Sequence, residues 1–149
     1  NFNLGEKQKT IEQLTKMINE HDVTYSPLAL YFLLDNNLLD NKNEINSLFD
    51  ELINETKLEK EIKNLIIYKK ALFNSEDVSE NDLLKILNPI INSESIWKSH
   101  SLYLIAEYFY SKNQKQKALE FFNQIVLLPN ANDDIKLESQ KRLIRDLGE

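Results

Sequence analysis

The residue types that most often carry enzymatic chemistry are sparse in this chain. It contains no cysteine and two histidines, His21 and His100, which fall in different helical segments and lack the spacing of a metal site. Its two glycines, Gly5 and Gly148, are too far apart for a phosphate-binding loop or a Gly-x-Ser-x-Gly nucleophile turn, and no His-Glu-x-x-His motif occurs. We therefore expect a protein that is not an enzyme and that needs no cofactor or metal ion.

Two acidic segments have simpler explanations than catalysis or metal binding. Residues 35–44, DNNLLDNKNE, lack the turn glycine of a calcium loop and have leucines in their middle, so we interpret them as a solvated loop. Asp133 and Asp134 are adjacent, and they open a helical segment, where the positive end of the helix dipole favours carboxylates. Neither segment predicts acid–base chemistry.

The composition is that of a globular protein. A chain of 149 residues with 42% hydrophobic and 28% charged residues can bury a core as one domain. A formal net charge of -6 disfavours binding to nucleic acid. The longest apolar run, residues 28–34, is too short to span a bilayer. We expect residues 1–149 to form a single domain that does not bind nucleic acid.

Apolar residues recur at intervals of three and four along nearly the whole chain, which predicts an all-α fold. Ser26 before Pro27 predicts an N-cap and a first-turn proline, and Ser79 with Asp82 predicts a capping box. The short polar links predict antiparallel neighbours. The expected helices span residues 6–21, 26–39, 43–55, 58–74, 80–92, 95–111, 115–128 and 133–147.

One segment, residues 100–129 with the sequence HSLYLIAEYFYSKNQKQKALEFFNQIVLLP, resembles a tetratricopeptide repeat. Asn113 stands at the repeat's turn glycine, and asparagine is the next-best residue for a positive φ. Weaker copies align Ala29, Ile66 and Ala106 at spacings of 37 and 40 residues. The expected core positions of the clear repeat are Leu102, Ile105, Ala106, Phe109, Ala118, Phe122 and Ile125. Those of the weaker copies are Leu28, Ala29, Phe32, Ile45, Leu48, Phe49, Leu52, Ile62, Leu65, Ile66, Leu83, Leu84 and Leu87.

The resemblance implies a tetratricopeptide-like, right-handed superhelical stack of antiparallel helix pairs, about eight helices in all. The first expected helix has the pattern of a second helix whose partner is missing. Since the chain starts at Asn1, we interpret it as a fragment that begins within a repeat. Residues 133–147 would then form the C-terminal capping helix.

In such a stack the first helix of each pair lines a concave face. The alignment on Ala106 predicts a protein- or peptide-binding strip, with space for an extended, partly acidic peptide. Tyrosines at helical spacing are also typical of half-buried packing residues, and lysines of a solvated face, so both interpretations stay open. Trp97 is expected to pack on the preceding helix pair. The strip consists of Lys60, Lys63, Lys70, His100, Tyr103, Glu107 and Tyr110.

Three stretches carry a second resemblance: SPLALYFLLDNNLL, LLKILNPIINSESIWKSHSLYLIAEYFYSKNQKQKALEFFNQIVLLP and LESQKRLIRDLGE. Their order is similar to that in alphaproteobacterial tetratricopeptide-like proteins related to the ancillary subunit of the bacterial Sec translocon. The resemblance implies a domain that faces the periplasm from the inner membrane, behind an N-terminal transmembrane anchor absent from this fragment. It also implies translocon subunits, periplasmic chaperones or nascent polypeptides as partners, and it offers no catalytic residues.

Two functions follow from these patterns. The favoured one is a non-catalytic scaffold for protein–protein interaction, the periplasmic domain of an ancillary subunit of the Sec translocon or a related envelope assembly. The alternative is a soluble repeat module, cytosolic or periplasmic, that binds short peptides or acidic tails in the strip. A homodimer through an exposed terminal helix, with residues 6–21 as the first candidate, is a further structural possibility.

Overall fold

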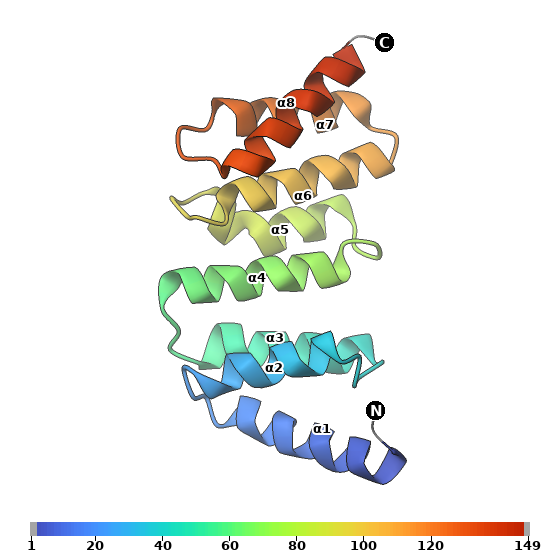
Figure 1. The fold of residues 1–149 in the computed structure, drawn as a ribbon, viewed down its shortest axis with the longest axis vertical. Helices are drawn as coiled ribbons and strands as arrows, with labels where there is room; N and C mark the ends of the chain where they lie inside the picture. Colours follow the sequence, from blue (N-terminus) through green and yellow to red (C-terminus); the bar gives the residue numbers. More distant parts are fainter. Residues whose placement is uncertain (1–2, 148–149) are drawn as a thin grey trace. The chain divides into compact units, whose positions relative to one another are not determined.

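The computed structural model describes residues 3–147, and within this range the chain forms eight α-helices and no strand (Figure 1). The all-α fold predicted from the apolar periodicity is therefore confirmed. The helices form two compact units, Asn1–Ile66 and Ile67–Glu149, with the boundary inside α4. None of the described helices is long and apolar enough to cross a membrane. The helices are α1 (Leu4–Asn19), α2 (Tyr25–Asp35), α3 (Lys42–Glu55), α4 (Lys60–Asn74), α5 (Glu80–Ile91), α6 (Lys98–Ser111), α7 (Lys115–Leu127) and α8 (Asp133–Leu147).

In the first unit, α1 packs along α2, and both contact α3. The turn into α2 differs from the prediction that Ser26 is its N-cap. Thr24 is the N-cap residue, without a capping bond from its own side chain, and Asp22 Oδ1 accepts hydrogen bonds from the backbone N–H groups of Tyr25 (2.7 Å) and Thr24 (2.8 Å). These bonds lower the pKa of Asp22. Ser26 is instead buried, and its hydroxyl donates to the Met17 carbonyl at 2.6 Å while it accepts from the Asp22 N–H at 2.8 Å.

The second helix ends at Asp35, four residues before the predicted end at residue 39. Asn37 adopts a positive φ of 50°, which a helix cannot continue through. The chain then folds back, so that the Leu38 N–H donates to the Leu33 carbonyl at 3.1 Å and the Leu38 side chain is buried. An asparagine in the left-handed conformation therefore ends this helix.

The predicted core of the weaker copies is partly wrong. Leu28 (53% exposed) and Phe32 (43%) lie on the outer face of α2, whose buried face consists of Ala29, Leu30 and Leu33 together with Ser26 and Pro27. Ile62 of α4 is also exposed, at 41%. Because α2 is apolar almost all round, its periodicity could not select the face that is buried. The buried positions that confirm the prediction are Ala29, Ile45, Leu48, Phe49, Leu52, Ile66, Leu83 and Leu87, whereas Leu65 and Leu84 are half-buried.

The second unit is built around α6, which contacts α5, α7 and α8. Figure 1 shows α6 and α7 as an antiparallel hairpin, with α8 returning along α7, a helical-repeat-like arrangement. Asn113 has a φ of 60° in the turn between α6 and α7, as its place at the repeat's turn glycine predicted. Ser79 caps α5 by accepting from the Asp82 N–H at 3.2 Å. Every core position predicted for the clear repeat is buried: Leu102, Ile105, Ala106, Phe109, Ala118, Phe122 and Ile125.

Candidate functional site

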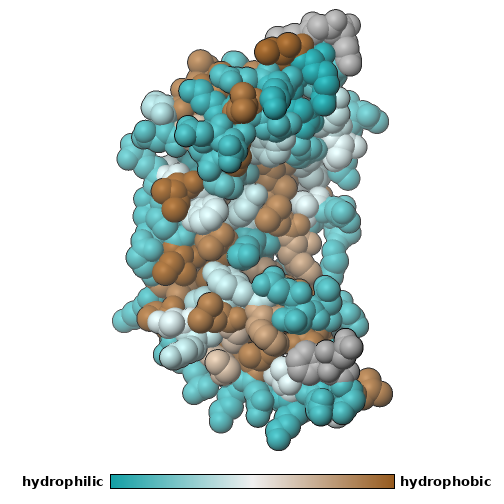
Figure 2. Space-filling view, in the orientation of Figure 1, coloured by the Kyte–Doolittle hydropathy of each residue, from teal (hydrophilic) through white to brown (hydrophobic). Residues whose placement is uncertain are grey.

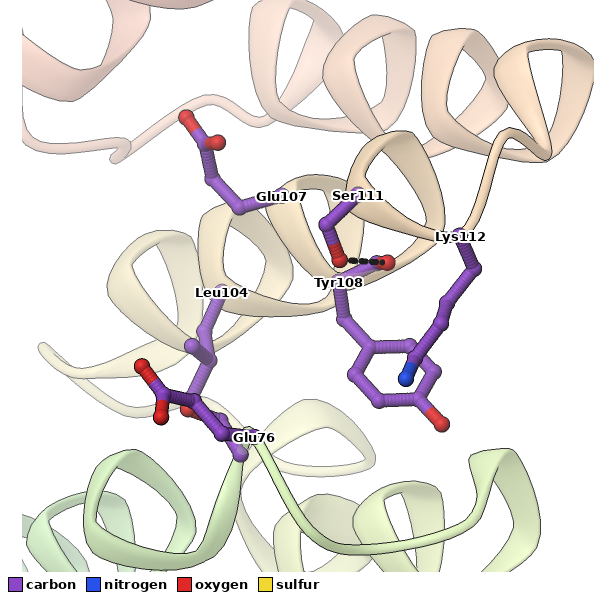
Figure 3. Close-up of a pocket in the computed structure, with 7 residues that line it drawn as sticks. Glu76, Leu104, Glu107, Tyr108, Ser111 and Lys112 are labelled. Atoms are coloured by element: carbon purple, nitrogen blue, oxygen red, sulfur yellow. Dashed lines mark hydrogen bonds between the residues drawn. The ribbon is translucent and has the colours of Figure 1, made fainter.

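A cleft of about 350 Å³ lies in the second unit, between the loop that follows α4 and the C-terminal half of α6 (Figure 3). We call it the α6 cleft. Three of its lining residues on α6 share one face of the helix, because positions 104, 108 and 111 are three or four residues apart. The lining residues are Ser75, Glu76, Leu104, Glu107, Tyr108, Ser111 and Lys112.

The floor of the α6 cleft is made of side chains held in place. Leu104 and Tyr108 are 9% and 8% exposed, so each shows only an edge to solvent. The Tyr108 hydroxyl donates to the Val78 carbonyl at 2.8 Å, and its ring packs edge-on against Phe109. The Ser111 hydroxyl donates to the Tyr108 carbonyl at 2.7 Å, the dashed bond in Figure 3. The apolar floor is thus fixed before any ligand arrives.

The rim of the cleft carries charges of both signs. The Lys112 ammonium lies 5.4 Å from the centroid of the Tyr108 ring, and Figure 3 shows it above that ring. Glu76 is exposed and lines the cleft from the loop after α4, and Glu107 points away from Lys112 (Figure 3). The cleft therefore has an acidic side and a basic side, with an apolar surface between them. None of its lining residues is a histidine or a cysteine.

Glu107 joins the cleft to a polar network beneath α8. Arg142 of α8 is 7% exposed, and its Nη1 lies 2.5 Å from Glu107 Oε1 and 3.5 Å from the Tyr103 hydroxyl. Its guanidinium lies between two rings, 4.6 Å from the centroid of Tyr110 and 4.7 Å from that of Phe122. Arg142 thus attaches α8 to both α6 and α7.

Burial and this ion pair set the ionisation of the network. Burial raises the pKa of Tyr103, and the hydrogen bond with Glu107 raises it further. For Arg142 burial alone would lower the pKa, but the bonds with Glu107 and Tyr103 outweigh it, and the pKa is raised. At neutral pH the network therefore holds a charged guanidinium and a neutral phenol. The Tyr110 hydroxyl also donates to Asp146 Oδ1 of α8, at 3.4 Å.

The predicted strip on α6 is thus divided between two environments. The structure brings Tyr103, Glu107 and Tyr110 together around Arg142, where they contact α8 as half-buried residues. His100 lies in a separate aromatic cluster, with ring centroids 4.9 Å from Trp97 and 5.8 Å from Tyr68. Burial lowers the pKa of His100, against the effect of its hydrogen bond with the Ile96 backbone.

The other predicted positions are distributed along α4. Lys60 and Lys63 lie in its first turns, in the first unit, and are exposed, whereas Lys70 is half-buried in the second unit. Of the predicted strip, only Glu107 lines the α6 cleft. Trp97 stacks on Tyr68 of α4, with centroids 6.1 Å apart, which confirms the packing role expected for it.

Sequence reasoning missed the floor of the cleft and the residue at the centre of the network. The 104, 108, 111 spacing on α6 was a usable signal for the floor. For Arg142 the signal was a polar stripe on the face of α8 that helical periodicity should bury. That stripe consists of Ser139, Arg142 and Asp146, all of which are buried. A buried polar stripe predicts partners on a neighbouring helix.

Comparisons with protein-family models, curated proteins and solved structures gave no match for this chain. Within residues 3–147, no group of three or more histidine, aspartate or glutamate side chains has the arrangement of a metal site. The resemblance to the translocon-associated family therefore rests on the three stretches quoted above.

Proposed function

We propose that this chain is a non-catalytic protein-interaction module whose second unit binds a short polypeptide segment in the α6 cleft. The observation that supports the proposal is the combination of a fixed apolar floor, Leu104 and Tyr108, with a rim that carries charges on opposite sides. Peptide-binding sites combine an apolar anchor with a few polar groups that set orientation in this way.

The rim favours a segment with a basic side chain next to an apolar one. Two carboxylates, Glu76 and Glu107, lie among the lining residues against one ammonium, that of Lys112. Because Glu107 already pairs with Arg142, Glu76 is the main partner for an incoming lysine or arginine. The Lys112 ammonium at the other side suits a backbone carbonyl or a carboxylate. This ligand differs from the acidic peptide expected from the lysines of α4.

The test compares two labelled pentapeptides, Ala-Leu-Arg-Leu-Ala and its counterpart with glutamate in place of arginine, by fluorescence anisotropy. We expect the arginine peptide to bind at least about fivefold more tightly, the effect of roughly 1 kcal/mol at a partly exposed ion pair. Glu76→Lys should remove this preference. The matched control Glu120→Lys changes an exposed carboxylate of α7 by the same charge and should leave it intact.

Two results would reject the proposal. One is equal or tighter binding of the glutamate peptide, which would favour the acidic-tail hypothesis instead. The other is the absence of amide shift changes at Leu104, Tyr108 and Ser111 in a titration of the ¹⁵N-labelled protein with the arginine peptide. Retained helicity of Glu76→Lys by circular dichroism shows that a loss of binding is local.

The resemblance to translocon-associated proteins suggests where such a module would work. It would place the module at the periplasmic face of the inner membrane, with translocon subunits, chaperones or nascent chains as partners. Reading the coding sequence upstream of Asn1 and fractionating the full-length protein from its host tests this placement. Protection from protease in intact cells and cleavage in spheroplasts would support it, whereas a protein that stays in the soluble cytosolic fraction would contradict it.

A further inference from the structure

The outer face of α8 exposes apolar side chains that its own unit does not cover. Leu137 is 52% exposed and Ile144 is 75% exposed, and their separation of seven residues puts them on one stripe of the helix. The opposite face is buried through Ser139, Arg142 and Asp146. Figure 2 shows apolar groups surrounded by hydrophilic surface where α8 runs. A stripe of this kind on an outer helix is typical of a surface that another helix covers.

On one side of this stripe the exposed charges are sorted by sign along the helix, whereas the half-buried Lys136 lies on its other side. The first half carries the exposed carboxylates Asp134 and Glu138, and the second half carries the exposed cations Lys141 and Arg145. The pairs 134/145 and 138/141 are both centred between positions 139 and 140. A two-fold axis through that point would therefore place each carboxylate of one copy opposite a cation of the other.

We infer that α8 pairs with α8 of a second copy of this chain, antiparallel and around a two-fold axis. In this arrangement Asp134 faces Arg145 and Glu138 faces Lys141, and each pair forms twice because the interface is isologous. Leu137 of one copy then lies within two residues, about 3 Å along the axis, of Ile144 of the other. Both stripes are covered by the same contact that neutralises the charges.

The charge order favours a second copy over other partners. A face with acidic and basic halves is complementary to itself when reversed, whereas a basic or an acidic partner would meet like charges over half its length. The exposed face of α2, with Tyr25, Leu28 and Phe32, has no comparable charge order that would define a partner. The proposed pairing is independent of the α6 cleft. All the residues that it uses lie on α8, and none of them lines the cleft.

A single pair of helices of this length covers less than the roughly 1,600 Å² of a standard interface, so the dimer should be weak. We expect sedimentation velocity to show a monomer at low concentration and a growing dimer fraction at concentrations on the order of 100 µM. Ile144→Asp should keep the protein monomeric throughout. A wild-type protein that stays monomeric up to about ten times that concentration overturns the inference.

A charge-exchange experiment tests whether the charged positions of α8 face one another across the contact. One variant carries Asp134→Lys and Glu138→Lys, and the other carries Lys141→Glu and Arg145→Glu. Each variant alone should remain monomeric, because like charges then face one another, whereas an equal mixture should form a heterodimer. The control Lys9→Glu with Lys16→Glu makes the charge change of the second variant on exposed positions of α1 and should dimerise like the wild type. Dimers of either variant alone, or a mixture that does not pair, overturn the arrangement.

Discussion

Two aromatic helices of this protein have similar sequences and different surroundings. The α2 sequence YSPLALYFLLD and the α6 sequence KSHSLYLIAEYFYS are both rich in tyrosine, phenylalanine and leucine. On α6 each tyrosine has a partner: Tyr103 contacts Arg142, Tyr108 donates to Val78, and Tyr110 donates to Asp146. On α2, by contrast, Tyr25 is 61% exposed and Leu28 is 53% exposed.

The difference lies in what other segments of the same unit contribute to each helix. For α6, the return of α8 brings an arginine and an aspartate to the tyrosine face, and the loop before α5 brings a carbonyl. On α2 the side chains of Tyr25, Leu28 and Phe32 stay exposed, and Figure 2 shows apolar surface where α2 runs. An aromatic helix pattern therefore does not by itself distinguish a packed face from an open one.

The largest expected effect comes from removing one phenylalanine on each helix. Phe109→Ala on α6 deletes a ring that is 1% exposed and should lower the free energy of unfolding by about 3 to 5 kcal/mol. Phe32→Ala on α2 deletes a ring that is 43% exposed and should cost less than about 1 kcal/mol. Urea denaturation followed by circular dichroism measures both. Similar losses for the two variants would mean that the outer face of α2 is covered in solution.

A second, smaller effect is expected from the arginine that closes the α6 face. Arg142→Leu keeps an apolar contact between the rings of Tyr110 and Phe122 but removes the ion pair, and should cost about 2 kcal/mol. Because the Glu107 side chain is 41% exposed, water can take the place of the lost partner, which limits the loss. Trp97, the single tryptophan, reports the unfolding of the second unit.

Two companion variants make the Arg142 measurement specific. Arg142→Lys keeps the charge and loses the planar stacking. Its free energy of unfolding should therefore lie between those of the wild type and Arg142→Leu. Lys85→Leu alters an exposed position of α5 in the same unit and should leave the transition unchanged. If all three variants unfold like the wild type, the network does not hold α8 in place.

The smallest effect is a dependence of stability on pH. Burial lowers the pKa of His100 below its ordinary 6.5, so the unfolded chain takes up a proton more readily than the folded one. The His100 contribution is therefore complete above pH 6.5 and is lost as the pH falls below that value toward the folded-state pKa. The urea midpoint followed by Trp97 fluorescence should fall between pH 7 and pH 5.5, and His100→Gln should reduce this slope. An equal slope in the variant would assign the pH dependence to other groups.

The helix positions could be predicted from the local sequence, whereas the side-chain partners at the candidate site could not. The interval of apolar residues predicted every described helix within about four residues at either end, and Asn113 predicted the turn after α6. Local rules worked there because hydrogen bonds and caps join residues that are close in sequence. The partners of Tyr103 and Glu107 are 39 and 35 residues away in the chain, and no local pattern specifies them.

The errors have one physical cause. Leu28 and Phe32 were expected in the core because α2 is apolar on every side, so that the sequence could not distinguish its two faces. For the α6 tyrosines a groove-facing role and half-buried packing both stayed open, because their partners lie on α8, far away in the sequence. In both cases the missing information was which helix covers which face.

The buried hydroxyl of Ser26 determines how the connection between α1 and α2 can be altered. One oxygen atom accepts from the Asp22 N–H and donates to the Met17 carbonyl, so it joins the end of α1 to the start of α2. An inserted residue would move both backbone groups away from it and leave a polar atom buried without a partner. The connection after α1 is thus a poor place for an affinity tag, a protease site or new chain termini, although it lies between two helices at positions 20–24, where a loop graft would ordinarily be attempted.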